Sequence, residues 1–271
     1  MSEQERESQA GRLRASRRDA SVPLRVNDVL GNAFEFVESP RRVVSLVPSL
    51  TETLFDLGAG DDVVGITDFC IFPEDIGKPR VGGTKNPRID AIRALAPDLV
   101  YVNLEENLEH HAKAMEEFAP VFVTEPKTVD DVAALIATLG AIHHRHDRAQ
   151  ELIALLQNER TRVAEFTFAV PIWKKPWMWC GGDTYVSSLV ESIGGTNVLR
   201  DQTRYPSLDL DDVLALRPDV VFLPDEPYEF TGDDAVEISG PRIVSPFPGH
   251  LFTWHGTRTI LGLRFLHECF V

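Results

Sequence analysis

Hydrophobic and polar positions alternate along this chain in the manner of strands followed by short helices. From residue 42 onward, short β-branched runs are separated by stretches with helical spacing, which indicates crossover units and a mainly parallel sheet. The predicted strands of the first half are residues 42–46, 63–67, 99–102 and 121–124. Those of the second half are residues 168–172, 220–223 and 242–245. The pattern predicts an α/β fold.

Between the two sets of strands, apolar residues recur at helical spacing with no strand among them. The stretch from Thr128 to Glu165 would form a helix of roughly 55 Å at 1.5 Å per residue if unbroken. Gly140 and the polar run 143–147 are the places where it could bend. Because such a helix is too long for a crossover within one sheet, the pattern predicts a spine that joins two lobes.

An internal repeat supports the two lobes. Residues 90–102 and 211–223 match position for position, and each follows a Gly-Gly-Thr at a short distance. Two similar lobes imply a cleft between them. We expect a disordered tail over residues 1–25, an N-terminal lobe over 26–126, a connecting helix over 127–165 and a C-terminal lobe over 166–271.

Composition excludes several classes of function. The chain has 271 residues, of which 43% are hydrophobic and 25% charged, as in an ordinary globular protein. No stretch approaches the roughly 18 apolar residues of a membrane span, and a net charge of −15 argues against nucleic acid as a partner. Three cysteines (Cys70, Cys180 and Cys269) are too few for a disulfide framework or a thiolate metal site. No metal site and no cofactor are predicted.

The first residues bear on the location of the protein. Residues 1–21 contain basic side chains but no apolar stretch of about 7–15 residues, which a secretory signal requires. No cysteine follows them that could carry a lipid anchor. As the chain is written, we expect a cytoplasmic protein, and a periplasmic one if its start lies elsewhere.

Large aromatic side chains gather in the segments that follow predicted strands, where open parallel sheets bind their ligands. All four tryptophans lie in two such segments. They could belong to the lobe core, but a proline-flanked position after a strand favours a surface for a large flat ligand. The aromatic residues predicted to contact this ligand are Phe69, Trp173, Trp177, Trp179, Tyr228 and Trp254.

Signals for catalysis are weak. The chain has no Gly-x-Gly-x-x-Gly turn after a strand, no P-loop and no Gly-x-Ser-x-Gly elbow. His250 and His255 could reach a bound metal centre or only a backbone carbonyl. Cys180 could be a reactive thiol or a small buried residue. We expect a non-enzymatic protein with no catalytic residues.

A set of short motifs occurs in a fixed order along residues 27–271. They are Arg42-Val-Val-Ser-Leu-Val-Pro-Ser-Leu-Thr-Glu, Val81-Gly-Gly-Thr, Leu95-Ala-Pro-Asp-Leu-Val, Gly194-Gly-Thr-Asn-Val and Leu216-Arg-Pro-Asp-Val-Val. In this order they resemble the substrate-binding proteins of cobalamin and ferric-siderophore ABC importers. The resemblance implies two Rossmann-like lobes with mainly parallel sheets, joined by one long helix.

The resemblance also implies roles for single residues. Thr67-Asp-Phe-Cys and Gly181-Gly-Asp-Thr-Tyr look closest to the cobalamin-binding branch of that family, which places Asp183 and Tyr185 among the expected ligand residues. Phe69 and Trp254 match aromatic residues that contact the ligand in such relatives. Asp90 and Asp211 are equivalent in the internal repeat and match acids on the lobe tips that pair with importer arginines.

Together these features imply a monomeric, non-catalytic binding protein that delivers cobalamin or another corrinoid to an ABC permease dimer. The ligand is the transported molecule and not a cofactor. A ferric siderophore or haem is the alternative ligand. An intracellular corrinoid-processing enzyme that uses Cys180, Asp183 and His255 is the alternative function.

Overall fold

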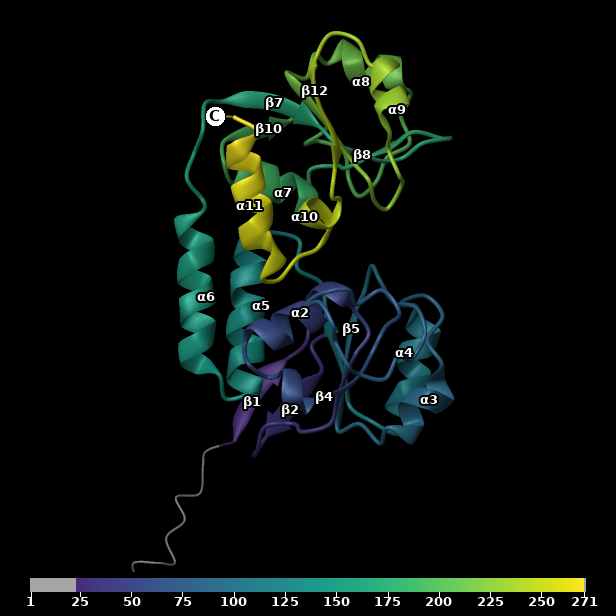
Figure 1. Cartoon of the computed structure of the whole chain (residues 1–271), viewed down its shortest axis with the longest axis vertical. Coiled ribbons are helices and arrows are strands. Elements are labelled where there is room, and N and C mark those ends of the chain that lie inside the picture. Colours follow the sequence, from purple (N-terminus) through teal and green to yellow (C-terminus); the bar gives the residue numbers. More distant parts are fainter. Residues whose placement is uncertain (1–22, 271) are drawn as a thin grey trace, which may run out of the picture.

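The computed structural model describes residues 23–270, which form two α/β lobes stacked along the long axis of the molecule (Figure 1). Each lobe has its own sheet of four parallel strands. The predicted α/β fold with two mainly parallel sheets is therefore confirmed. No helix within the described residues is long and apolar enough to cross a membrane.

The N-terminal lobe has the strand order β4-β3-β5-β6. Its strands are buried along almost their whole length, as expected for a parallel sheet covered on both faces. Side chains of Val43 and Tyr101 point to one face, and those of Val44 and Val100 point to the other. The elements are β3 (Val43–Ser45), α2 (Pro48–Asp56), a 3-10 helix (Gly60–Asp62), β4 (Val63–Ile66), α3 (Ile89–Ala94), β5 (Leu99–Asn103), α4 (Glu109–Glu116) and β6 (Val121–Thr124).

The C-terminal lobe repeats this topology, with the strand order β10-β7-β11-β12. In each four-stranded sheet, the second strand in chain order (β4 or β10) lies at one edge, beside the first (β3 or β7). The helix that precedes the third strand is α3 in one lobe and α8 in the other, as the internal repeat predicts. The elements are β7 (Phe166–Ala169), β8 (Pro171–Trp173), β9 (Met178–Trp179), α7 (Tyr185–Glu191), β10 (Gly195–Asn197), α8 (Leu210–Ala215), β11 (Val220–Pro224), α9 (Gly232–Val236), β12 (Arg242–Phe247), α10 (His250–Thr253) and α11 (Arg258–Glu268).

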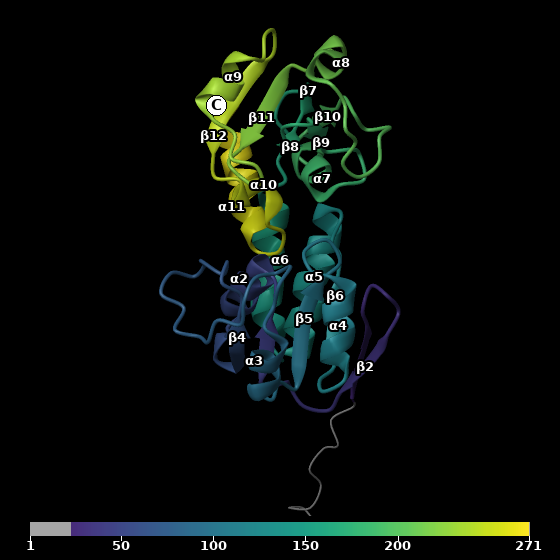
Figure 2. The same cartoon turned by 90° about the vertical axis from the view of Figure 1, so that its right-hand side faces the viewer.

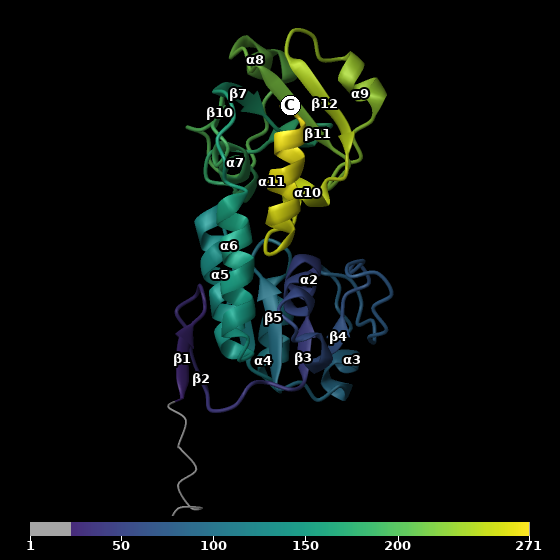
Figure 3. The ribbon, with the colours of Figure 1, turned by 60° about the vertical axis from the view of Figure 1, so that its left-hand side comes forward.

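The prediction of one connecting helix over 127–165 is wrong, because two helices occupy this region. Helix α5 (Val129–Ile142) and helix α6 (His146–Asn158) lie side by side (Figure 3). The chain reverses at His144, whose φ of 53° is left-handed and ends α5. Gly140 allows the close approach of the two helices, since a Cβ there would lie 2.4 Å from the Cβ of Ala149. The spine is therefore a helical hairpin.

A second difference concerns the start of the described chain, where the sequence predicts a disordered tail that reaches residue 25. Strands β1 (Leu24–Asn27) and β2 (Ala33–Phe36) form an antiparallel hairpin whose turn is held by the carboxylate of Asp28. The ring of Phe34 lies 5.0 Å from that of Phe122, which attaches the hairpin to the N-terminal lobe. The predicted tail over 1–25 thus overlaps a strand at its end, and its residues 1–22 lie outside the described residues.

The two lobes meet where the carboxyl ends of both sheets face each other. Helix α2 follows β3 and helix α10 follows β12, and both lie at the junction of the lobes (Figure 2). At this junction the first residue of α11 and the residue before it pack on α2. The guanidinium of Arg258 donates two hydrogen bonds to the carboxylate of Glu52, one of them 2.9 Å long, and both side chains are nearly inaccessible to solvent. The backbone N–H of Thr257 donates to the hydroxyl of Thr53 at 3.1 Å.

Candidate functional site

Side chains from segments that follow strands of the two sheets contact one another across the junction of the lobes, as Phe72 does with Trp254 and Glu105 with Arg204. The carboxyl ends of the strands are the usual ligand position in open parallel sheets. We use the name cleft for this contact region of the two lobes. On the N-terminal side it is bordered by the segments after β4, β5 and β6. On the C-terminal side it is bordered by residues 181–184, 202–205 and 225–230 and by the segment around α10.

Aromatic rings meet across the cleft. Phe72, from the segment after β4, lies edge-on to His250 at 5.1 Å and to Trp254 at 5.8 Å between ring centroids. The guanidinium carbon of Arg258 lies 3.8 Å from the centre of the Phe72 ring, a cation–π contact. Phe72 of the N-terminal lobe is therefore surrounded by three side chains of the C-terminal lobe.

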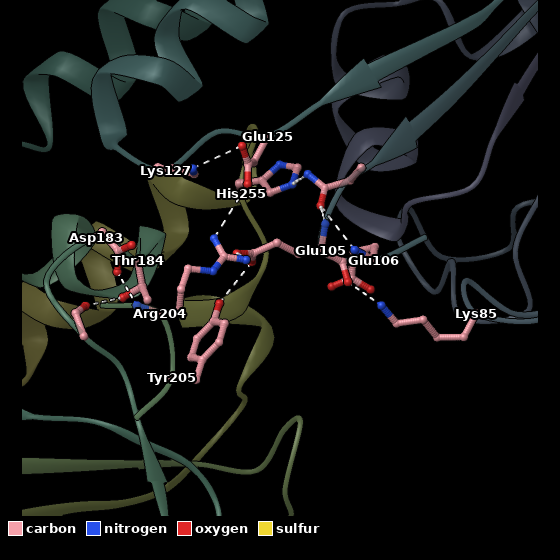
Figure 4. Close-up of polar contacts among 12 residues, drawn as sticks. Lys85, Glu105, Glu106, Glu125, Lys127, Asp183, Thr184, Arg204, Tyr205 and His255 are labelled. Atoms are coloured by element: carbon pink, nitrogen blue, oxygen red, sulfur yellow. Dashed lines mark hydrogen bonds and ion pairs between the residues drawn. The ribbon is translucent and has the colours of Figure 1, made fainter. Parts of the chain in front are cut away.

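A polar cluster joins the lobes beside these rings (Figure 4). Arg204 of the C-terminal lobe lies 2.7 Å from the carboxylate of Glu105 and 3.6 Å from that of Glu125, both in the N-terminal lobe. The hydroxyl of Tyr205 donates to the second oxygen of Glu105 at 3.0 Å. Burial and the charge of Glu105 raise the pKa of Tyr205, so the phenol keeps its proton and remains a donor.

His255 is a buried part of the lobe contact. Its Nε2 lies 3.3 Å from the side-chain nitrogen of Asn103, and its Nδ1 lies 3.3 Å from the hydroxyl of Ser49. Because an amide N–H can only donate, Nε2 accepts this bond and Nδ1 carries the proton. Burial lowers the pKa of His255 to about 4, so the ring is neutral at physiological pH. These contacts occupy both ring nitrogens.

Two acidic side chains face the cleft from opposite lobes, Glu106 after β5 and Glu226 after β11. Neither has an ion-pair partner within 4.0 Å among residues 23–270. Desolvation is the main cause that raises the pKa of each, and the charge of Glu106 contributes to the shift at Glu226. The side chain of Glu106 is exposed overall. Neighbouring protein atoms nevertheless displace water from around its carboxylate, which makes the carboxylate harder to ionise.

The structure brings some of the predicted ligand residues to the cleft. Trp254 contacts Phe72 across it, and Phe69 is 58% exposed on the segment that also carries Phe72. Trp173 is 44% exposed and lies edge-on to Tyr228 at 5.5 Å, on the C-terminal lobe. These four side chains keep solvent-accessible surface that a ligand could contact.

Other predicted ligand residues lie inside the C-terminal lobe. Trp179 requires a correction, because its side chain is completely buried in the core and its indole N–H donates to the carbonyl of Leu208 at 2.9 Å. Trp177 is only partly buried and stacks on Trp179, with the ring centroids 5.4 Å apart. Tyr185 is buried as well, and its hydroxyl lies 2.8 Å from that of Thr259. These rings stabilise the lobe in this structure.

Asp183 has a different position from the one expected for a ligand residue. Its carboxylate accepts a hydrogen bond from the backbone N–H of Arg204. It therefore supports the residue that reaches across the cleft.

The two predicted docking acids occupy equivalent places. Asp90 is the second residue of α3 and Asp211 is the second residue of α8, and both are exposed. The carboxylates are thus available to solvent in both lobes while lying at the positive end of a short helix.

The groups considered for an enzyme do not assemble. Cys180 is fully buried, and desolvation raises the pKa of its thiol, which disfavours the reactive thiolate. Both ring nitrogens of His255 already have hydrogen-bond partners within the protein. Within residues 23–270, no three His, Cys, Asp or Glu side chains are grouped closely enough to hold a metal ion.

Sequence reasoning did not identify Glu105, Glu125, Arg204 or Tyr205 as functional. Glu125 comes directly after the predicted strand that ends at residue 124, and Glu105 lies three residues after the predicted strand that ends at residue 102. This position after strand ends is a signal that could have selected them. Arg204 and Tyr205 lie far from any predicted strand end, and no pattern in the sequence pairs them with the glutamates.

Known proteins share this fold. A vitamin B12-binding protein of Vibrio parahaemolyticus is 24% identical over 195 residues, or 68% of this chain and 71% of the relative. The periplasmic haem-binding protein of Roseiflexus superposes with a TM-score of 0.73 at 22% identity, covering 86% of this chain and 98% of the other. A protein of an ABC-type Fe³⁺-hydroxamate transport system from Saccharomonospora viridis superposes with a TM-score of 0.70 at 24% identity, covering 92% and 99%.

The sequence model of a family described as periplasmic binding protein matches residues 43–237. This match corrects one expectation. A cytoplasmic location is wrong for this chain, because its family and its relatives are extracytoplasmic binding proteins. The matched region runs from the first strand of the N-terminal sheet to α9 of the C-terminal lobe. The chain belongs to the periplasmic binding protein family.

Proposed function

We propose that this substrate-binding protein holds a corrinoid, cobalamin first, in the cleft and delivers it to an ABC permease. The proposal rests on the apolar surface that the cleft segments expose. Phe69 and Ile71 are more than half exposed, and Leu104 is 44% exposed. Trp173, at the end of strand β8, packs against Tyr228 and is also 44% exposed. Side chains of this kind on segments after strands suit the apolar faces of a large flat ligand.

The charges in the cleft favour a corrinoid over haem. A haem carries two propionate carboxylates, which would meet Glu106 and Glu226. Neither acid forms an ion pair within 4.0 Å among residues 23–270, although the nearby charge of Lys85 opposes the rise in the pKa of Glu106. The guanidinium of Arg204 is already engaged by Glu105 and Glu125. The side-chain amides of cobalamin can instead donate hydrogen bonds to carboxylates. A haem or a ferric siderophore remains the alternative ligand.

Visible absorption titrations with cyanocobalamin, haemin and a ferric hydroxamate test this proposal. We expect cyanocobalamin to bind with a dissociation constant in the micromolar range or below, about −8 kcal/mol or better. Trp254→Ala should weaken binding by about 1–3 kcal/mol, because it removes the ring that meets Phe72 across the cleft. Leu155→Ala, on the exposed face of α6, is the control and should leave affinity unchanged. A haemin complex with no corrinoid binding would contradict the choice of ligand.

Delivery to a permease would use Asp90 and Asp211. Their equivalent positions in two similar lobes suit a partner with two equivalent basic patches, such as a permease dimer. Exposed ion pairs of this kind steer association and weaken with salt. We expect the double variant Asp90→Ala, Asp211→Ala to lose most of its association with the permease at low salt while corrinoid affinity stays unchanged. Undiminished association would show that the acids serve only their own helices.

A further inference from the structure

Arg204 has a backbone conformation that L-amino acids rarely adopt. Its φ is 56°, in the left-handed region where residues other than glycine are disfavoured. Residues in such conformations persist when their surroundings hold them, and they concentrate at functional sites. The left-handed conformation of Arg204 therefore needs a structural explanation.

The neighbouring segment 181–183 holds Arg204 in place. The carboxylate of Asp183 accepts the N–H of Arg204, and the N–H of Gly181 donates to the carbonyl of Arg204 at 2.8 Å. A side chain at position 181 would not fit, because a Cβ there would lie 2.5 Å from the carbonyl oxygen of Gln202. Both main-chain polar groups of Arg204 are thus fixed by one tightly packed turn.

This fixed backbone directs the side chain at the other lobe (Figure 4). The guanidinium meets Glu105 and Glu125, and Tyr205 holds the second oxygen of Glu105. Glu105 is anchored in its own lobe, since its backbone N–H donates to the side-chain oxygen of Asn103 at 2.8 Å. The chain of contacts from Asp183 to Asn103 is continuous across the cleft.

We infer that Arg204 is a positioning residue that, together with the buried pair of Glu52 and Arg258, fixes the separation of the two lobes and thereby the residence time of the ligand. The part of this inference that concerns the ligand rests on the proposed function. The guanidinium fixes how far the segments 202–205 and 103–105 can move apart. Because Arg204 is 44% exposed, its ion pairs are open to screening by salt.

Stopped-flow release of cyanocobalamin gives the first test. Arg204→Gln should release the ligand about tenfold faster, with a smaller change in the association rate, as is usual for substitutions at one interface. Raising the salt from about 0.05 M to about 1 M should speed release from the unmodified protein and leave Arg204→Gln unaffected. Asp183→Asn should also speed release, because it weakens the acceptor that holds the backbone of Arg204.

Arg93→Gln is the matched control. Arg93 is 48% exposed, lies 3.5 Å from Glu117 and stacks on Phe118, so it resembles Arg204 in exposure, ion pairing and aromatic contact. All three of these residues belong to the N-terminal lobe. The control removes the same charge without touching the cleft. Release from Arg204→Gln at the rate of this control would overturn the inference.

A second measurement needs no ligand and so separates this inference from the proposed function. Spin labels on Lys113→Cys in α4 and Asp212→Cys in α8, with Cys269→Ser, report the distance between the lobes by double electron–electron resonance. The remaining Cys70 and Cys180 are buried and do not compete for label. We expect one narrow distance distribution that broadens toward longer distances in Arg204→Gln. An unchanged distribution would overturn the positioning role, even if cyanocobalamin binds as proposed.

Discussion

Replacing Arg258 with alanine is expected to lower the free energy of unfolding by about 3–5 kcal/mol, because it leaves the carboxylate of Glu52 buried without its partner. Both side chains are almost inaccessible, and two hydrogen bonds join them. Burial already raises the pKa of Glu52, and Arg258 is the main group that opposes this shift. Urea denaturation followed by tryptophan fluorescence measures the change.

Two further variants identify the cause. The exposed pair of Arg25 and Glu35 is the control, and Arg25→Ala should change stability by less than about 1 kcal/mol. Changing both buried partners, Glu52→Leu with Arg258→Met, should recover much of the loss, because no charge is then left unpaired. A loss below about 1 kcal/mol in Arg258→Ala would mean that water reaches Glu52.

Trp179→Ala is expected to destabilise the protein by about 3–5 kcal/mol, the range for removing a buried aromatic side chain from a core. The ring has no exposed surface, and it carries a stacked neighbour in Trp177. Since Trp179 does not reach the cleft, molecules that remain folded should bind cyanocobalamin with unchanged affinity. Thermal unfolding and a binding titration below the unfolding temperature give the two quantities.

Trp179→Phe is the companion variant, because it keeps most of the volume and removes the donor to the carbonyl of Leu208. Trp179→Phe should lower the free energy of unfolding by less than the alanine variant does. If either change reduced corrinoid affinity in folded protein while stability stayed high, Trp179 would have a ligand role that its burial here does not support.

The fold was largely predictable, because parallel strands buried on both faces form recognisable apolar runs. The repeat at residues 90–102 and 211–223 even indicated which elements of the two lobes correspond. The polar run 143–147 indicated where the helix could bend, but the full reversal at His144 was not predictable from periodicity, since apolar spacing continues on both sides of it. Periodicity reports which residues face a neighbour and does not report that the neighbour is the next helix of the same chain.

The site was predictable in part, and the tryptophans show why. The segment after residue 170 reads as an aromatic loop, but it forms the hairpin of β8 and β9. Trp179 pairs with Pro171 in this hairpin and turns into the core. Trp254 has no such strand to join and stays at the cleft. The contacts of Arg204 link residues about 80 to 100 positions apart in sequence, and only the folded structure brings these together.

The contact between α2 and the start of α11 ties the N-terminal lobe to the last helix of the chain. Glu52 and Arg258 are 206 positions apart. Closing a contact over so long a stretch of chain costs more conformational entropy than closing a local one, and contacts of long range slow folding. The N-terminal lobe therefore completes the buried ion pair of Glu52 only when the end of the chain is in place.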